Sequence, residues 1–425
     1  MRNLLIKVLF WFTRRIIRVQ KPFIIGITGS VGKTSTKEAI ATVLRQRYRL
    51  RASAKSFNNE LGLPFTVIGV EEPGRDLGAW WGILTKSLSL LKKQPDYPEL
   101  LILEMGADRQ GNIQQLTGLA PLNVGVLTTI GPSHLEFFKT IDAVVKEKSD
   151  IFRNLPADGL AVLNIDDPLI ATLTGKVHSK LLTYGFNEQA DVRASDDTLS
   201  NQNNGWGIAF KINYQGNTVP AFLPLSITKA SVSAALAAAA VGLHQGMNLV
   251  EVAQALRHFQ PPAGRGRLIG GLNGLLLIDD TYNASPQSTK AALTTLQRLA
   301  KEMNATTGAV LGEMLELGDY TVSAHQEIGR VAGEINVGFL VAVGEHAEVI
   351  RQGAAEAGLP ADRIVTVPTS IAALEYLQKK NLAGTLLLVK GSQGTRTERI
   401  VRGLMADQSR AEELLVRQSP SWLKR

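Results

Sequence analysis

Short apolar runs rich in β-branched residues recur along the chain, and helix-compatible stretches separate most of them. The runs span residues 23–27, 100–104, 124–128, 160–164, 275–279, 309–312, 340–343 and 386–389. Buried strands that alternate with helices predict an α/β fold with mainly parallel sheets. Residues 181–224 differ, because they are polar and turn-rich with short alternating pieces, and they predict a small antiparallel excursion.

The chain has 425 residues, a length that suits two or three domains. The sequence PPAGRGR at residues 261–267 predicts a linker, since Pro and Gly interrupt helices. We therefore expect a basic helix over residues 1–22, a central domain over 23–262, a second α/β domain over 263–410 and a tail over 411–425. Cysteine is absent, which excludes disulfides, thiolate zinc sites and cysteine nucleophiles.

The first 21 residues contain six basic and no acidic side chains, and they predict an amphipathic helix. One stripe carries Lys7, Arg14, Arg18 and Lys21, and the opposite stripe carries Leu5, Leu9, Phe12, Ile16 and Val19. Two interpretations stay open: a helix packed on its own domain, or a helix lying on an anionic membrane face. The net charge of +8 favours anionic partners, but no long Lys/Arg block points to nucleic acid.

A strand-like run leads into the sequence TGSVGKTS at residues 28–35, after which the pattern becomes helical. Gly29 and Gly32 allow the backbone to approach a phosphate, and the N–H groups at the helix start face the anion. Lys33 can reach the terminal phosphates, and the Thr34 hydroxyl can bind Mg²⁺. The loop is shorter than the strict GxxxxGK[ST] pattern. We assign nucleotide binding to Gly29, Ser30, Val31, Gly32, Lys33, Thr34 and Ser35.

Further segments follow in order: SFNNELGLP, LEMGADRQGNI, HLEFF, KEKSDIF, LNIDDP, GRGRL, IDDTYNASP, LGEMLELG and LVKGSQG. Together with the loop they resemble the Mur ligase family, and most closely its MurF type, over about residues 23–400. The resemblance implies a P-loop ATP-binding domain with a mainly parallel sheet and a C-terminal Rossmann-like α/β domain. It also implies ATP and Mg²⁺ as cofactors and amide-bond formation through an acyl phosphate. The implied substrates are a UDP-muramoyl peptide and D-alanyl-D-alanine.

The resemblance also implies a catalytic and metal-binding set. Thr34, Glu104 and His134 match magnesium positions, and Lys33 and His134 match catalytic positions. Lys148 belongs to both groups, because it matches a family lysine whose carbamylation creates an anion able to ligate a second Mg²⁺. Lys146 is the competing assignment for that lysine.

Other family positions are implied to contact the nucleotide and the two substrates. Arg265, Asp280 and Asn283 are expected to reach the nucleotide, with Asp280 placed toward the ribose. Asn58 and Asn59 lie in a loop that in the family contacts the carboxylate-bearing substrate. The incoming amine substrate is expected to dock near Glu313, His325, Lys390 and Ser392.

Two departures from the family pattern affect these expectations. Members of this type usually carry an N-terminal domain that grips the UDP-sugar, whereas here the first nucleotide strand begins at Phe23. Three alternatives follow for that substrate: it is held differently, it is held by a partner, or it is replaced by a lipid-linked or truncated acceptor. The Ala-rich helix expected over Ala230–Gly242 usually opens with a His-Asn-x-x-Asn-Ala pattern whose asparagine meets adenine. The matching residues, Ala230–Ala235, contain no asparagine, so base selectivity is open.

We therefore expect a cytoplasmic, ATP-dependent amide ligase of peptidoglycan precursor synthesis, peripheral to the inner membrane face if its first helix lies on lipid. One alternative is another ligase of the superfamily, with a folylpolyglutamate or lipid-linked product. The other is a non-catalytic nucleotide-binding scaffold. The presence of Glu104, His134 and Lys148 together argues against the scaffold, because a binding module does not need a two-metal arrangement.

Overall fold

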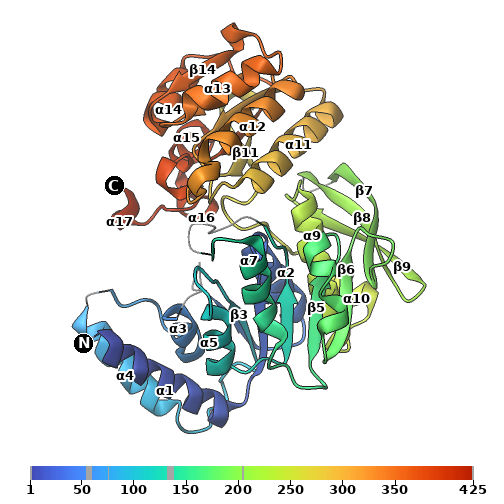
Figure 1. Cartoon of the computed structure of the whole chain (residues 1–425), viewed down its shortest axis with the longest axis vertical. Helices are drawn as coiled ribbons and strands as arrows, with labels where there is room; N and C mark the ends of the chain where they lie inside the picture. The colour runs from blue at the N-terminus through green and yellow to red at the C-terminus, as the bar shows by residue number, and fades with distance from the viewer. Residues whose placement is uncertain (1, 54–59, 75, 132–137, 203–204, 424–425) are drawn as a thin grey trace.

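The computed structural model describes residues 2–53, 60–74, 76–131, 138–202 and 205–423. These residues form two α/β domains, each built on its own sheet. Figure 1 shows the C-terminal domain above the N-terminal one. The predicted α/β fold with mainly parallel sheets is confirmed.

The first sheet extends from the phosphate loop to the polar segment near residue 200. Within the described residues its strand order is β2 (Leu50–Ala52), β3 (Leu100–Glu104), β1 (Phe23–Thr28), β4 (Val124–Leu127), β5 (Leu160–Asn164), β6 (Lys180–Gly185), β7 (Val192–Gln202), β8 (Gly205–Tyr214) and β9 (Asn217–Pro224). Pairing is parallel as far as β7, while β8 and β9 add antiparallel strands. The antiparallel excursion is therefore smaller than expected, because β6 is parallel, and it continues the main sheet.

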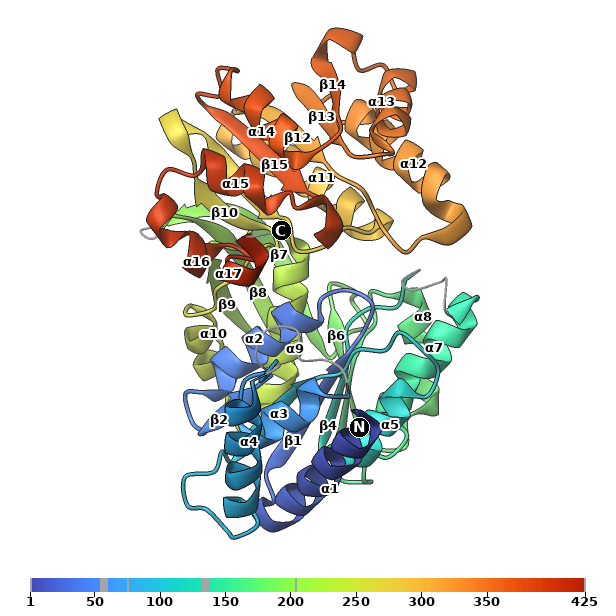
Figure 2. The same cartoon turned by 90° about the vertical axis from the view of Figure 1, so that its left-hand side faces the viewer.

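Helices cover both faces of this sheet (Figures 1 and 2). One face packs against α2 (Lys33–Leu44), α9 (Lys229–His244) and α10 (Leu249–Leu256). The other packs against α1 (Arg2–Gln20), α3 (Gly62–Ile68), α4 (Leu77–Ser89), α5 (Asn112–Leu119), α7 (Ile141–Ser149) and α8 (Pro168–Ala171). Because both faces are covered, the strands are continuous apolar runs. The predicted Ala-rich helix is α9, which is apolar on almost all sides and correspondingly buried.

The second sheet is formed between residues 267 and 390. Its strand order is β10 (Arg267–Gly270), β11 (Leu276–Asp280), β15 (Thr385–Lys390), β12 (Thr306–Leu311), β13 (Phe339–Val343) and β14 (Ile364–Val367). Helices α11 (Pro286–Met303), α12 (Thr321–Glu334) and α13 (Ala347–Glu356) pack on one face, and α14 (Ser370–Gln378), α15 (Glu398–Leu404) and α16 (Ala411–Leu414) on the other. Only β10 is antiparallel among the described strands, and its first residue, Arg267, ends the expected linker.

Short 3₁₀ turns connect several elements, at Asp150–Phe152, Thr174–Lys176, Leu272–Gly274, Gly318–Tyr320, Ala361–Arg363, Gln393–Thr395 and Gln408–Arg410. The tail expected over residues 411–425 begins with the short helix α16, which carries Glu412 and Glu413. Beyond it, α17 (Pro420–Leu423) lies at the boundary between the two domains, as Figure 2 shows.

The N-terminal helix packs on its own domain, as the first of the two interpretations predicts. Leu9, Phe12 and Ile16 are buried in the same apolar cluster as Leu101 and Leu103 of β3. These three residues of the apolar stripe of α1 therefore stabilise the N-terminal domain and are not available to lipid. None of the described helices combines the length and the apolarity that crossing a bilayer requires.

Candidate active site

The phosphate loop joins β1 to α2, and two glycines allow its shape. Gly29 has a φ of 149° and Gly32 a φ of 90°, both in the region that favours glycine. A Cβ on Gly29 would lie 2.0 Å from the Thr128 hydroxyl, just beyond β4. Ser30 and Val31 donate their backbone N–H groups to Thr129 at 2.8 Å and 2.9 Å. The end of β4 thus holds the loop, while α2 has no side-chain cap on its first N–H groups.

Lys33, the first residue of α2, folds back over this loop. Its Nζ donates to the carbonyl oxygen of Gly29 at 2.6 Å and to that of Ser30 at 3.3 Å. Burial lowers the pKa of Lys33; the Glu104 carboxylate opposes this shift, and the Arg265 guanidinium adds to it. A phosphate beside Nζ would offset the loss of solvation, so this lysine suits an anionic ligand.

Thr34 and Glu104 meet beside the loop, where β1 and β3 end. The Thr34 hydroxyl donates to the Glu104 carboxylate at 3.1 Å, and Glu104 is buried. Mg²⁺ prefers such oxygen ligands next to phosphates. The residues present therefore fit the magnesium ion that the sequence predicts. His134, the other expected ligand, falls in residues 132–137, outside the described part of the chain.

The helix α7 contributes Lys148 to the same region. The side chain is buried, and burial together with the nearby charge of Lys33 lowers its pKa to about 7. A neutral amine is the form that reacts with CO₂ to give a carbamate. The competing Lys146 is exposed. The environment therefore favours Lys148 over Lys146 as the modified lysine.

Two cavities meet at the phosphate loop. The larger, about 730 Å³, lies between the loop and the segments that follow β11, β12 and β15. The smaller, about 340 Å³, lies between the loop, the start of α9 and α11. Both are lined by Val31, Gly32, Thr34, Arg265 and Ser288. Parallel α/β sheets bind ligands at the carboxyl ends of their strands. The larger cavity therefore brings the ligand-binding edge of the second sheet to the phosphate loop.

Arg265 stands between the two cavities. Its guanidinium lies 3.9 Å from the centroid of the Tyr282 ring. Its buried Nε has no hydrogen-bond partner among the described residues. A buried donor without a partner is costly, and an anionic ligand would supply one. The position predicted for nucleotide contact is thus a cationic side chain in the wall shared by the two cavities.

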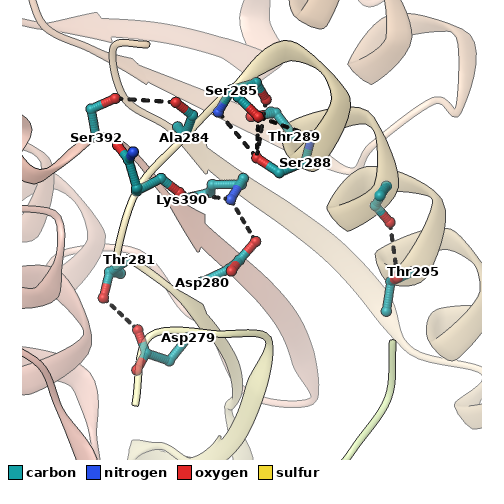
Figure 3. A network of polar contacts seen from close by, with 12 residues as sticks. Asp279, Asp280, Thr281, Ala284, Ser285, Ser288, Thr289, Thr295, Lys390 and Ser392 are labelled. Atoms are coloured by element: carbon teal, nitrogen blue, oxygen red, sulfur yellow. Dashed lines mark hydrogen bonds and ion pairs between the residues drawn. The ribbon is translucent and has the colours of Figure 1, made fainter. Parts of the chain in front are cut away.

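Figure 3 shows Asp280 and Lys390 joined in an ion pair. The Lys390 ammonium donates to Asp280 at 2.6 Å and to the Asn283 carbonyl oxygen at 3.0 Å, and it is almost fully buried. Asp280 and Lys390 line the smaller cavity, whereas Asn283 lines the larger one. The sequence assigned Lys390 to the amine substrate. The geometry places it on the other side, where it orients Asp280.

His325 is fully buried, and neither cavity is lined by it. Its Nδ1 donates to the Thr321 carbonyl oxygen at 2.6 Å, and its Nε2 accepts the Met314 N–H at 3.0 Å. With both ring nitrogens occupied, His325 holds the loop that follows β12. The expected direct contact with the amine substrate does not fit this geometry.

Glu313 and Ser392 also support that loop. Glu313 accepts the N–H of Glu345 at 3.1 Å and lies 3.0 Å from His346 Nδ1, away from both cavities. The Ser392 hydroxyl accepts the Leu315 N–H at 3.1 Å and lines the larger cavity. Of the four residues expected to meet the amine substrate, Ser392 is therefore the one placed to do so. Asn58 and Asn59 fall outside the described residues.

Two family models match most of this chain. Residues 27–79 and 83–242 match the Mur ligase middle domain, and residues 264–393 match the domain described as "Mur ligase, glutamate ligase domain". UDP-N-acetylmuramoyl-tripeptide--D-alanyl-D-alanine ligase of Mycobacterium tuberculosis (strain CDC 1551 / Oshkosh) is 34% identical over 402 residues, which cover 90% of this chain and 73% of that protein. The chain belongs to the Mur ligase family.

Solved structures agree with that assignment. MurF from Acinetobacter baumannii superposes with a TM-score of 0.78 at 26% identity, covering 95% of this chain and 81% of that one. MurF ligase from Thermotoga maritima, solved in complex with ADP, has the same fold, with a TM-score of 0.75 at 24% identity. It covers 94% of this chain and 83% of that one.

Sequence reasoning missed two residues of this Mur ligase site. Arg396 and Trp422 both line the larger cavity, although Trp422 lies in the tail. The signal was present in VRQSPSW at residues 416–422, where a proline and a tryptophan interrupt a charged tail. Long-range pairing of the tail with the loop after β11 is not visible from local sequence.

Proposed function

We propose that this Mur ligase joins D-alanyl-D-alanine to a UDP-N-acetylmuramoyl tripeptide, with conversion of ATP to ADP and phosphate. The observation that carries the proposal is the larger cavity, where Lys33, Thr34 and Glu104 face the strand ends of the second sheet. The relatives named for this reaction support the choice of substrates. The use of ATP and a nucleotide-linked precursor supports a cytoplasmic location for the proposed reaction.

The reaction needs a phosphate, a carboxylate and an amine aligned in one place. The loop N–H groups and Lys33 hold the terminal phosphates. Thr34 and Glu104 would hold Mg²⁺, which neutralises charge on the phosphate oxygens. The tripeptide carboxylate attacks the γ-phosphorus, the bond to ADP breaks, and an acyl phosphate forms. The dipeptide amine then attacks the acyl carbon, loses a proton and expels phosphate.

The smaller cavity suits the nucleoside of ATP. It adjoins the loop, and Asp280, held by Lys390, is available there for the ribose hydroxyls. At the start of α9 its wall consists of Thr228, Lys229 and Ala230, without an amide side chain. The amide side chain that lines this cavity comes instead from Gln287, at the start of α11.

Phosphate release from ATP and Mg²⁺ tests the proposal directly. We expect release only when UDP-muramoyl tripeptide and D-alanyl-D-alanine are both present, because the tripeptide carboxylate must first form the acyl phosphate and the dipeptide amine must then expel phosphate from it. Release with a glutamate or lipid-linked acceptor instead would favour another ligase of the superfamily. Nucleotide binding without turnover on any acceptor would favour the scaffold alternative.

We also propose that α1, together with α4, touches an anionic membrane surface. Several large apolar side chains stay exposed on the two helices: Leu5, Val8, Trp11, Leu77, Trp81 and Leu88. The helices lie side by side in Figures 1 and 2. Gln20 ties their C-terminal ends together, because its side chain donates to the carbonyl oxygens of Leu90 and Lys92.

The charge of this surface fits anionic lipid. Lys7, Arg14, Arg18 and Lys21 are exposed, and no acidic residue occurs within α1 or α4. Exposed tryptophans beside basic side chains are typical of a membrane interface. The contact proposed here is therefore shallow and uses the exposed side chains of α1, not the buried Leu9, Phe12 and Ile16.

Replacing Arg14 and Arg18 by Gln is expected to weaken binding to phosphatidylglycerol vesicles roughly 30-fold, since each basic residue contributes about 1 kcal/mol. Vesicle co-sedimentation at low salt measures the effect. The matched control replaces Lys301 and Lys379, which are exposed on the C-terminal domain, by Gln. It removes the same charge and should change binding little. Equal loss in both pairs, or no binding by the parent protein, would rule out this surface.

A further inference from the structure

The end of the described chain returns to the larger cavity. Trp422, in α17, lines that cavity together with the phosphate loop and the segment after β15. Figure 2 shows α17 at the boundary of the two domains. This segment lies beyond residues 264–393, which the family model matches. The family match therefore does not assign a role to this segment.

Arg417 anchors the segment. Its guanidinium donates to the carbonyl oxygen of Thr281 at 3.0 Å and to that of Tyr282, and it pairs with Glu398 at 2.9 Å. Its side chain is only 6% exposed. Buried charge-assisted contacts of this kind fix geometry. The tail is therefore held against the loop after β11.

Arg396 is the group that the tail holds at the cavity. Its Nε donates to Glu398 at 2.6 Å, and its Nη2 donates to the Trp422 carbonyl oxygen at 3.0 Å. The guanidinium also lies 5.2 Å from the centroid of the Trp422 ring. Arg396 is 9% exposed and lines the cavity. Its Nη1 has no hydrogen bond to any described residue.

The charge balance of this group leaves room for an anion. Arg396 and Arg417 both pair with the single carboxylate of Glu398, so the three side chains carry one excess positive charge. A largely buried, unbalanced charge is costly unless a ligand pairs with it. A planar guanidinium with a free N–H is suited to a carboxylate.

We propose that Arg396, positioned by Trp422 and Glu398, binds the carboxylate of the incoming amine-bearing dipeptide. The inference rests on the proposed function, because that reaction brings an amine with a free carboxylate into this cavity. The amine must reach the acyl carbon beside the phosphate loop, so the carboxylate needs a separate cation. Lys33 and Arg265 lie near each other at the phosphate loop, whereas Arg396 lines the cavity from the segment after β15.

Arg396→Gln is expected to raise KM for D-alanyl-D-alanine about 10- to 100-fold, the range of a lost hydrogen bond to a charged group. KM for ATP should change less than about twofold. The same variant should no longer distinguish D-alanyl-D-alanine from its C-terminal amide, which the parent enzyme should use poorly. Trp422→Ala should raise KM in the same direction, and Trp422→Phe should restore it, since Phe keeps an aromatic face.

Two controls separate a binding role from a structural one. Arg402→Gln, on α15 and six residues further along the chain, removes an equal charge and should leave both KM values unchanged. Arg396→Lys keeps the charge and should lie between the parent and Arg396→Gln, with thermal unfolding as the check on folding. Equal loss on the dipeptide and its amide would overturn the inference alone. A parent protein inactive with D-alanyl-D-alanine would overturn the proposed function and the inference together.

Discussion

Replacing Lys33 by alanine is expected to lower kcat by at least about 10³-fold, the effect of removing a preorganised cation from a phosphoryl-transfer site. In the structure its Nζ lies at the phosphate loop, 2.6 Å from the Gly29 carbonyl oxygen. No other lysine of the described residues lines the larger cavity. Without Lys33, the negative charge that develops on the transferred phosphoryl group would therefore lack its principal positive partner.

The variant should fold as well as the parent. Burial already lowers the pKa of Lys33, so removing the ammonium relieves a desolvation cost. Lys37→Met is the matched control, because Lys37 is buried one turn later and donates to the Ser53 carbonyl oxygen. That variant should lose stability and retain nucleotide affinity. Phosphate release and ADP binding measure both, and near-normal turnover of Lys33→Ala would exclude the assigned role.

The fold was largely predictable because most strands are buried on both faces. Runs such as 100–104 and 160–164 are continuous and apolar, and the structure has strands with the same bounds. The pattern fails where burial is one-sided or incomplete. The four-residue strand β10 begins inside an apparent Gly-Pro linker, and β6 begins within a segment that also contains polar antiparallel strands. β10 is too short for a periodic pattern, and the buried residues of β6, Thr183–Gly185, do not form an apolar run.

The site was predictable where chemistry depends on neighbouring residues. The loop geometry of Gly29 and Gly32 follows from a strand, a turn and a helix in direct succession. Contacts between segments that are distant in the sequence could not be predicted. Lys390 pairs with Asp280 instead of the amine substrate, and His325 uses both ring nitrogens on the backbone. A motif gives a residue's neighbourhood, but the partner that occupies its polar atoms is set by tertiary packing.

Lys148→Met is expected to abolish most activity while raising stability at pH 7. The loss should be about 10³-fold, since several kcal/mol of charge stabilisation go with the anion that carbamylation of this lysine would provide. Stability should rise because the folded-state pKa is about 7, below the usual 10.5, so the unfolded chain binds this proton more tightly. The parent's free energy of unfolding therefore increases with pH between those values, and the variant's advantage at pH 7 fades toward pH 10.

Bicarbonate gives this prediction a second readout. In CO₂-depleted buffer the parent should be slow and should be activated by added bicarbonate, because the neutral Lys148 amine attacks CO₂ and releases a proton. Activation should weaken below pH 7, where the amine is protonated. Lys146→Met, from the exposed neighbour on α7, should behave as the parent in every assay. Full activity of Lys148→Met, or loss confined to Lys146→Met, would move the modified lysine to the alternative position or remove it from the mechanism. A variant that is more stable yet inactive would mean that Lys148 is retained for chemistry at a cost to the fold.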